Sequence, residues 1–231
     1  MTSKPFQIRQ HLHRYPELSG SETETARYVV EQLKISGISE IYSDFAQNAV
    51  LAVIRGKNSG KAILFRSELD ALPIAEINKF KHRSVHSNIS HKCGHDGHIT
   101  SLLALAQNLA ENPLEKGTVL LLFQPSEEIG TGAKSVLDSQ ILERFDLDFV
   151  FAYHNLPGYP LGQVLCKSGT FTPSVESFQA TLIGKTCHAS EPDKGINPTK
   201  AIAEFIQFMD KFQQPPKDLP NYCVLTPIHI V

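Results

Sequence analysis

The sequence contains no tryptophan, only four cysteines among 231 residues, and no apolar run that approaches the length of a membrane span. The cysteines are widely spaced and form no dense disulfide framework, so a reduced protein is expected. They are Cys93, Cys166, Cys187 and Cys223. Residues 1–6 also lack the apolar segment of a secretory signal. We therefore expect a cytoplasmic protein with no membrane partner.

The sequence has no large excess of charge of either sign. Lysine and arginine total 22, aspartate and glutamate total 24, and the formal net charge is −2. This balance gives no electrostatic reason to expect binding to nucleic acid or to an anionic membrane surface. Hydrophobic residues make up 41% and charged residues 20%, which is ordinary for a globular protein. The length suits one large domain, or one and a half smaller ones.

Short apolar runs alternate with helical patterns over most of the chain. One helix is predicted to start at a capping box, Ser21–Glu24, and to stop at Gly37. Further helices are predicted over 99–109 and 132–137, and buried strands over 49–54, 62–65, 118–123 and 149–153. This alternation predicts an α/β domain with a mostly parallel sheet and helices on both faces.

The pattern changes in the last part of the chain. Residues 177–183 alternate in the manner of a half-exposed strand, and an amphipathic helix is predicted over Pro198–Phe212. This succession predicts the start of a second, α+β unit. We therefore expect a first domain over residues 1–172 and a partial second domain over 173–231. The helix should expose an apolar face made of Phe205, Phe208 and Phe212.

The densest cluster of reactive side chains is the segment His91-Lys92-Cys93-Gly94-His95-Asp96-Gly97-His98. Thiolate, imidazole and carboxylate are the ligand types that hold zinc and similar divalent metals. Cys93 and His95 alternate by two, so both reach one pocket only if the segment is extended or looped. Asp96 is placed to orient a ligating histidine. A polar surface loop with a chance cysteine is the plainer interpretation, but the density of donors favours a metal site.

Further polar residues follow the predicted strands. Glu68 and Asp70 come after one strand, Glu127 and Glu128 after a second, and His154 after a third. In open α/β sheets, sites form beyond the carboxyl ends of strands, so we expect these residues to share a site. Two adjacent glutamates can supply one ligand and one proton carrier, which metal-assisted hydrolysis needs. A solvated helix start for the glutamates and a structural role for His154 remain open alternatives.

The remaining histidines carry a weaker signal. Exposed, solvated positions are expected for His11, His13, His82 and His86. His229 has no supporting neighbours. A cysteine hydrolase built on Cys93 and His95 is disfavoured, because a thiolate among so many ligand types is more readily bound by metal than left free.

Taken together, these motifs resemble those of the aminoacylase-type dinuclear metallopeptidases, in the subgroup of hippurate hydrolases, auxin-conjugate amidohydrolases and N-acetyl-diaminopimelate deacetylases. The matching segments run in the family's order and cover nearly the whole chain. They are residues 11–19 (HLHRYPELS), 70–74 (DALPI), 91–98 (HKCGHDGH), 123–128 (FQPSEE), 153–154 (YH) and 184–189 (GKTCHA). The resemblance implies a metal-dependent amidohydrolase that cleaves the amide bond of N-acyl amino acids or related conjugates.

The resemblance also implies a role for each matching residue. Two divalent metal ions, manganese or zinc and otherwise cobalt or nickel, would be held by Cys93, His95, Glu128 and His154. Glu127 would act as general base and acid, Asp70 would orient the metal ligands, and His188 would stabilise the oxyanion. In many relatives the last histidine reaches across a dimer, so the second domain is expected to serve as a lid or dimerisation domain of a homodimer.

Several features depart from the family pattern, including Lys92 beside Cys93 and Thr186-Cys187 before His188. Glu68 stands where the family usually has aspartate. Family members also continue beyond the matched segments, where they supply one more histidine ligand. The alternative function is therefore that of a truncated, weakly active or inactive homologue that binds metal or ligand, or that associates with a partner.

Overall fold

The computed structural model describes residues 4–212, 223–228 and 230, so His229 lies outside the described residues. The chain forms two compact units, divided between Leu161 and Gly162. The first unit holds the sheet and most of the helices.

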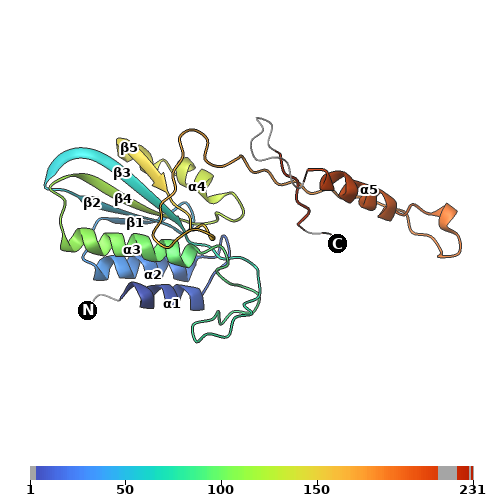
Figure 1. Ribbon diagram of the computed structural model, residues 1–231, viewed down its shortest axis with the longest axis horizontal. Helices are drawn as coiled ribbons and strands as arrows, with labels where there is room; N and C mark the ends of the chain where they lie inside the picture. Colours follow the sequence, from blue (N-terminus) through green and yellow to red (C-terminus); the bar gives the residue numbers. More distant parts are fainter. Residues whose placement is uncertain (1–3, 213–222, 229, 231) are drawn as a thin grey trace. The chain divides into compact units, whose positions relative to one another are not determined.

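The first unit is built on one five-stranded sheet with the strand order β1-β2-β4-β3-β5 (Figure 1). The strands are β1 (Ile41–Phe45), β2 (Ala49–Arg55), β3 (Asn58–Glu68), β4 (Lys116–Gln124) and β5 (Leu147–Ala152). β3 pairs in parallel with β4 and β5, whereas β2 pairs antiparallel with β1 and β4. The predicted α/β class is confirmed, but the sheet is mixed rather than mostly parallel. Residues 46–48 alone join β1 to β2, and so short a connection allows only antiparallel pairing.

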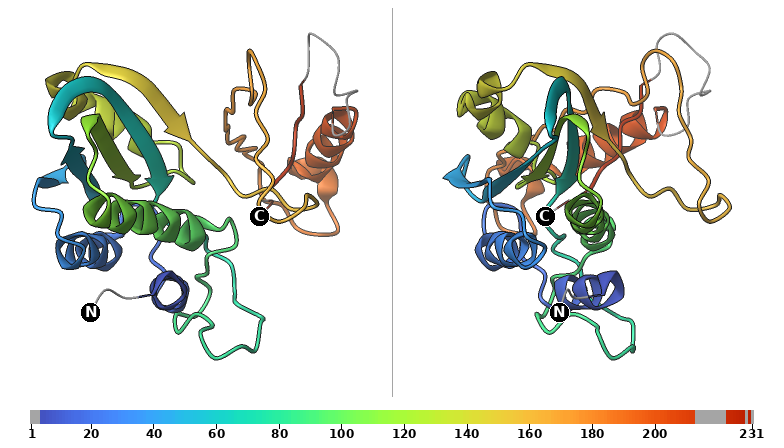
Figure 2. Two further views of the ribbon diagram at one scale, coloured as in Figure 1. Left: turned by 60° about the vertical axis from the view of Figure 1, so that its left-hand side comes forward. Right: turned by 90° about the vertical axis from the view of Figure 1, so that its left-hand side faces the viewer.

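Helices cover both faces of this sheet, as Figures 1 and 2 show. One face carries α1 (Pro5–Arg14), α2 (Thr23–Ile35) and α3 (His95–Glu111), and the other carries α4 (Gly132–Asp138) and the short 3-10 helix η1 (Ile141–Arg144). Leu33, Ile99 and Phe123 are fully buried in the first core, and Leu51 in the second. Burial of each such side chain contributes about 1.5–3 kcal/mol. Alternate residues of β2 point to opposite faces, so its continuous apolar run serves both cores.

α2 begins at Thr23 without the predicted capping box. The side chain of the N-cap residue Glu22 makes no capping hydrogen bond and is fully buried, whereas the Glu17 carboxylate accepts hydrogen bonds from two backbone N–H groups of the first turn. The Glu22 carboxylate accepts a hydrogen bond from the backbone N–H of Ser126 at 2.7 Å, so it holds the loop after β4 rather than the helix. The predicted end of this helix is confirmed, since Gly37 follows it with a φ of +85°.

α3 begins at His95, inside the histidine-rich motif, and not at residue 99 as predicted. Gly94 precedes it with a φ of +103°, a backbone conformation that favours glycine. The apolar periodicity misses the first turn because His95, Asp96 and His98 are polar and yet buried. The motif is therefore part loop and part helix.

β5 confirms the strand predicted over 149–153 but not its predicted burial. Every residue of β5 after Leu147 is exposed, with Val150 at 63%. β5 is an edge strand that pairs with β3 alone. An apolar run on an edge strand has fewer neighbours to cover it, so the sequence overestimates its burial.

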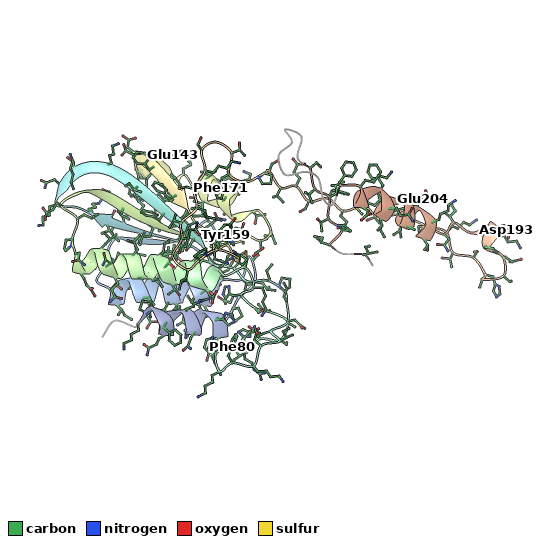
Figure 3. The ribbon with its side chains drawn as sticks, in the orientation of Figure 1. Phe80, Glu143, Tyr159, Phe171, Asp193 and Glu204 are labelled. Atoms are coloured by element: carbon green, nitrogen blue, oxygen red, sulfur yellow. The ribbon has the colours of Figure 1, made fainter. Side chains whose placement is uncertain are left out.

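In the second unit the described residues form α5 (Thr199–Asp210) and the 3-10 turn η2 (Pro192–Lys194), on which Figure 3 labels Glu204 and Asp193. Residues 177–183 do not form the predicted strand. The backbone pairing described in this unit is a single bridge between Lys185 and Ile196. A strand needs a neighbour for its hydrogen bonds, and the described part of this unit offers none to residues 177–183.

The predicted apolar face of α5 is largely confirmed. Phe205 is 36% exposed and Phe208 is 49% exposed, whereas Phe212 is half-buried and packs 5.3 Å from Phe208. The domain limits of 1–172 and 173–231 stay a prediction.

The longest described helix, α3, has 17 residues and opens with buried polar side chains. In the part of the chain that the structure describes, no helix is both long and apolar enough to cross a membrane.

A network of charged groups fastens α1 to the start of α3. His13 Nδ1 lies 3.0 Å from Asp96 Oδ2, and His13 Nε2 lies 2.8 Å from Glu76 Oε2. Arg9 Nε donates to the same Asp96 oxygen at 3.2 Å, and Lys92 pairs with Glu76. The prediction of an exposed His13 is wrong, since its side chain is only 12% exposed. Asp96 contacts His13 and not a predicted ligand, so its predicted orienting role is wrong as well.

The loop between β3 and α3 folds against this network. Phe80, labelled in Figure 3, packs edge-on against His13 at 5.3 Å and stacks on His82 at 4.2 Å. His82 is therefore half-buried rather than solvated. The hydrogen bond to Asp96 raises the pKa of His13, and that to Glu76 adds to the effect, against the opposing effect of burial.

We expect His13→Gln to lower the free energy of unfolding by about 1.5–3 kcal/mol near pH 5.5, the range for hydrogen bonds to charged groups, and by less near pH 9. The folded-state pKa of His13 is raised above 6.5, so the stabilisation is present below 6.5 and is lost as pH rises through the folded value. Urea unfolding followed by circular dichroism at both pH values measures this difference. His86→Gln, at an exposed loop position, is the control, and an equal cost of His13→Gln at both pH values would contradict the assignment.

Candidate metal centre

Four segments of the first unit meet where β3, β4 and β5 end. These three strands are adjacent and parallel, so their carboxyl ends share one edge of the sheet. The start of α3 lies at the same edge and adds its side chains to those of the strand ends. The side chains brought together are Asp70, Cys93, His95, Glu127, Glu128 and His154.

His95 lies at the centre of this arrangement and is fully buried. Its Nδ1 donates to the backbone carbonyl of Asp70 at 2.8 Å, which turns Nε2 towards the two glutamates. Nε2 lies 3.7 Å from Glu127 Oε2 and 3.7 Å from Glu128 Oε1, and it has no hydrogen-bond partner among the described residues. Burial lowers the pKa of His95, but Asp70 and Glu68 outweigh burial and raise it. The position therefore attracts a cation, and a divalent metal suits it.

Cys93 and His154 complete the donors around His95. Cys93 Sγ lies 3.3 Å from His154 Nε2, and His154 Nδ1 donates to the carbonyl of Asn155 at 2.8 Å. Cys93, His95 and His154 each offer a donor atom within 4.8 Å of the others, and so do His95, Glu127 and Glu128. Two donor groups that share one residue suit a pair of neighbouring metal ions. All four predicted ligands lie in these groups, and their role as ligands stays a prediction.

Asp70 fastens the loop that carries the two glutamates. Its Oδ2 accepts hydrogen bonds from the Ser19 hydroxyl at 2.7 Å and from the Glu128 backbone N–H at 2.9 Å. Burial would raise the pKa of Asp70, but His95, the Glu128 N–H and the Ser19 hydroxyl together lower it to about 2. Asp70 therefore holds His95 through its carbonyl and the Glu128 backbone through its carboxylate.

Negative charge gathers around Glu127 and Cys93. Burial and the neighbouring Glu128 raise the pKa of Glu127, whose side chain is 39% exposed against 20% for Glu128. Burial and the same glutamates raise the pKa of Cys93 to about 12. A divalent cation would offset this surplus of negative charge and favour the thiolate. Sulfur, nitrogen and oxygen donors, with His95 Nε2 and Glu128 Oε1 unpartnered among the described residues, fit manganese, zinc, cobalt or nickel.

His188 and His91 lie outside these donor groups. His188 belongs to the second unit, where it is exposed and its Nδ1 lies 2.8 Å from Ser190 Oγ. Its predicted role at an oxyanion stays a prediction. His91 is buried, and neither ring nitrogen has a partner among the described residues. Burial lowers the pKa of His91 to about 4, which keeps the ring neutral.

His98 and Asn155 occupy positions whose importance was not predicted. His98 Nδ1 lies 2.8 Å from Glu68 Oε2, and His98 Nε2 lies 2.7 Å from Asn155 Oδ1. Glu68, His95 and His98 form a further group of close donors. A signal was available, because His98 follows His95 by three residues and a helix that starts at His95 places both on one face.

The chain is similar in sequence to a known protein family and to several of its curated members. The family described as "Peptidase family M20/M25/M40" matches residues 64–219. The hippurate hydrolase of Campylobacter jejuni is 36% identical over 219 residues, which cover 95% of this chain and 57% of the relative. The N-acetyl-L-cysteine deacetylase of Bacillus subtilis is 40% identical over 200 residues, which cover 86% of this chain and 47% of the relative.

A solved structure of a dinuclear metal-binding M20 peptidase from Bacillus subtilis superimposes with a TM-score of 0.64 at 36% identity, over 68% of this chain and 44% of that one. This chain thus spans about half the length of the curated relatives it matches. The family match runs from β3 to beyond α5, so it includes every side chain of the candidate metal centre. The predicted resemblance is confirmed, and the chain belongs to peptidase family M20/M25/M40.

Proposed function

We propose that this chain forms the metal centre of an amidohydrolase that cleaves the amide bond of N-acyl amino acids or related conjugates. The observation that supports this most strongly is the convergence of Cys93, Glu128 and His154 on the unpartnered Nε2 of His95. The relatives point to the substrate class, since their names include hippurate hydrolase, N-acetyl-L-cysteine deacetylase and N-acetyldiaminopimelate deacetylase. Each of these names describes removal of an acyl group from an amino acid.

Cys93, His95, Glu128 and His154 are the residues proposed to hold two divalent metal ions, manganese or zinc first and cobalt or nickel otherwise. Bound there, such ions supply Lewis acidity towards the amide carbonyl and lower the pKa of water. The protein's own contribution is to hold the donors in place. His95 is turned by the Asp70 carbonyl, and the loop of Glu128 is held by the Asp70 carboxylate.

Glu127 is the proposed proton carrier. It stands next to Glu128, 3.7 Å from His95 Nε2, and its side chain is more exposed than that of Glu128. It would take a proton from the attacking water and deliver it to the leaving amine, whose departure needs protonation. His188 of the second unit is proposed to stabilise the oxyanion, and that unit to act as a lid or dimerisation domain.

A direct test is hydrolysis of hippurate and N-acetylcysteine by the purified protein supplied with manganese or zinc. We expect Glu127→Gln to lower kcat about 10²–10⁴-fold, the range for loss of general acid–base catalysis, with metal content unchanged. Glu128→Gln should lower metal content as well, because it alters a proposed ligand. Activity measured alongside elemental analysis of both variants separates the two roles. Loss of metal in Glu127→Gln with retention in Glu128→Gln would mean that the two glutamates have exchanged roles.

The exposed phenylalanines of α5 generate a prediction about association. Phe205 and Phe208 expose apolar surface, which favours burial against a second copy of the chain. We expect light scattering to show a species larger than the monomer, and Phe208→Glu to shift it towards the monomer. Gln207→Glu adds the same charge at a neighbouring exposed position and should leave the size unchanged. A monomer in all three proteins would contradict the proposed homodimer.

A further inference from the structure

Both sequence neighbours of His154 hold the same residue of α3. The Tyr153 hydroxyl donates to the backbone carbonyl of His98 at 2.5 Å. Asn155 Oδ1 lies 2.7 Å from His98 Nε2, and the Asn155 backbone nitrogen lies 3.1 Å from that same ring atom. His154 itself stands between these two attachments, with its ring 4.6 Å from the His98 ring at an interplanar angle of 71°.

His98 is in turn anchored to the interior of the sheet. Its Nδ1 lies 2.8 Å from Glu68 Oε2, and both side chains are almost completely buried. Arg66 pairs with Glu68 at 2.5 Å and donates through Nε to Gln124 Oε1 at 2.9 Å. Glu68 and Arg66 belong to β3 and Gln124 to β4, so His98 is tied to two central strands.

The segment that carries His154 has little else to fix it. It follows β5, an exposed edge strand with one neighbour, and His154 is itself exposed. Asn155 also approaches the loop of Cys93 so closely that a Cβ on Gly94 would lie 2.3 Å from its Oδ1. The contact between Asn155 and this loop therefore fixes the distance between Cys93 Sγ and His154 Nε2, which is 3.3 Å.

We propose that Glu68, His98, Tyr153 and Asn155, here termed the His98 clasp, are positioning residues that hold His154 at the metal centre and thereby set metal affinity. The inference rests on the proposed function in that it takes His154 as a ligand. It goes beyond that function because it assigns a role to four residues outside the proposed ligand set. Residues that orient ligands commonly change metal affinity about 10–100-fold when they are removed.

Cobalt(II) is a suitable probe, because its bond to a thiolate gives an absorption band that reports on Cys93 without any assay of activity. We expect the double variant Tyr153→Phe/Asn155→Ala to raise the Kd for cobalt about 10–100-fold. The matched control is Tyr42→Phe/Asn58→Ala, which removes a tyrosine hydroxyl bonded to Glu40 and an asparagine amide bonded to the Glu115 carbonyl. The control should bind cobalt as the unaltered protein does. A Kd for the clasp variant equal to that of the control would overturn the inference.

A double-mutant cycle separates positioning from general loss of stability. In a His154→Ala background, the clasp substitutions should change the Kd less than about twofold, because the ligand they position is gone. A full effect in that background would overturn the inference, since the clasp would then act through the fold and not through His154. If the unaltered protein does not bind cobalt, both the proposed metal centre and the proposed role of the clasp are refuted. Normal cobalt binding without hydrolysis of any N-acyl amino acid would instead refute the proposed function alone and leave the clasp standing.

Discussion

The geometry of the candidate metal centre depends on one buried hydrogen bond, from His95 Nδ1 to the backbone carbonyl of Asp70. Because it occupies one ring nitrogen, the other faces a space bounded by Glu127, Glu128 and the pair formed by Cys93 and His154. The acceptor is a main-chain atom just beyond β3, so the orientation of the ring is set by the sheet itself. A ring held in this way presents Nε2 in the same place whether or not a cation is bound.

The parallel half of the sheet explains why so many donors can meet there. β4, β3 and β5 are neighbours that run in one direction, and each delivers its polar residues at the same edge. The antiparallel strands β1 and β2 contribute core and not donors. β5 lies at the edge of the sheet, so the segment that follows it and carries His154 has few neighbours to hold it in place. The hydrogen bonds of Tyr153 and Asn155 to His98 offset that weakness.

The ligand types and the strand ends could be predicted from the sequence because both are local. The polar residues after each apolar run indicated which edge of the sheet carries the candidate metal centre. The residue types of Cys93 and His95 indicated metal binding. The long-range partners could not be predicted in this way. His13 looks like a surface histidine until α1 packs on α3 and brings it to Asp96 and Glu76.

Other differences have the same origin. The burial of β5 was expected from its apolar run, and a strand over 177–183 was expected from its alternating pattern. Burial and pairing depend on what packs against a segment, which its own residues do not specify. The first turn of α3 was missed because its buried residues are polar. Polar residues interrupt the apolar periodicity from which a helix is predicted, even where the helix continues. The sheet was expected to be mostly parallel because helices alternate with strands. The short connection at residues 46–48 imposes antiparallel pairing on β1 and β2, and β2 also pairs antiparallel with β4.

The most direct test of the metal centre is X-ray absorption spectroscopy of the zinc-loaded protein. The convergence of Cys93 with His95, Glu128 and His154 predicts sulfur at about 2.3 Å from zinc, together with nitrogen and oxygen at about 2.0–2.2 Å. The sulfur contribution should vanish in Cys93→Ser and persist in Cys187→Ser, which changes an exposed cysteine of the second unit. A zinc environment of nitrogen and oxygen alone in the unaltered protein would contradict the account.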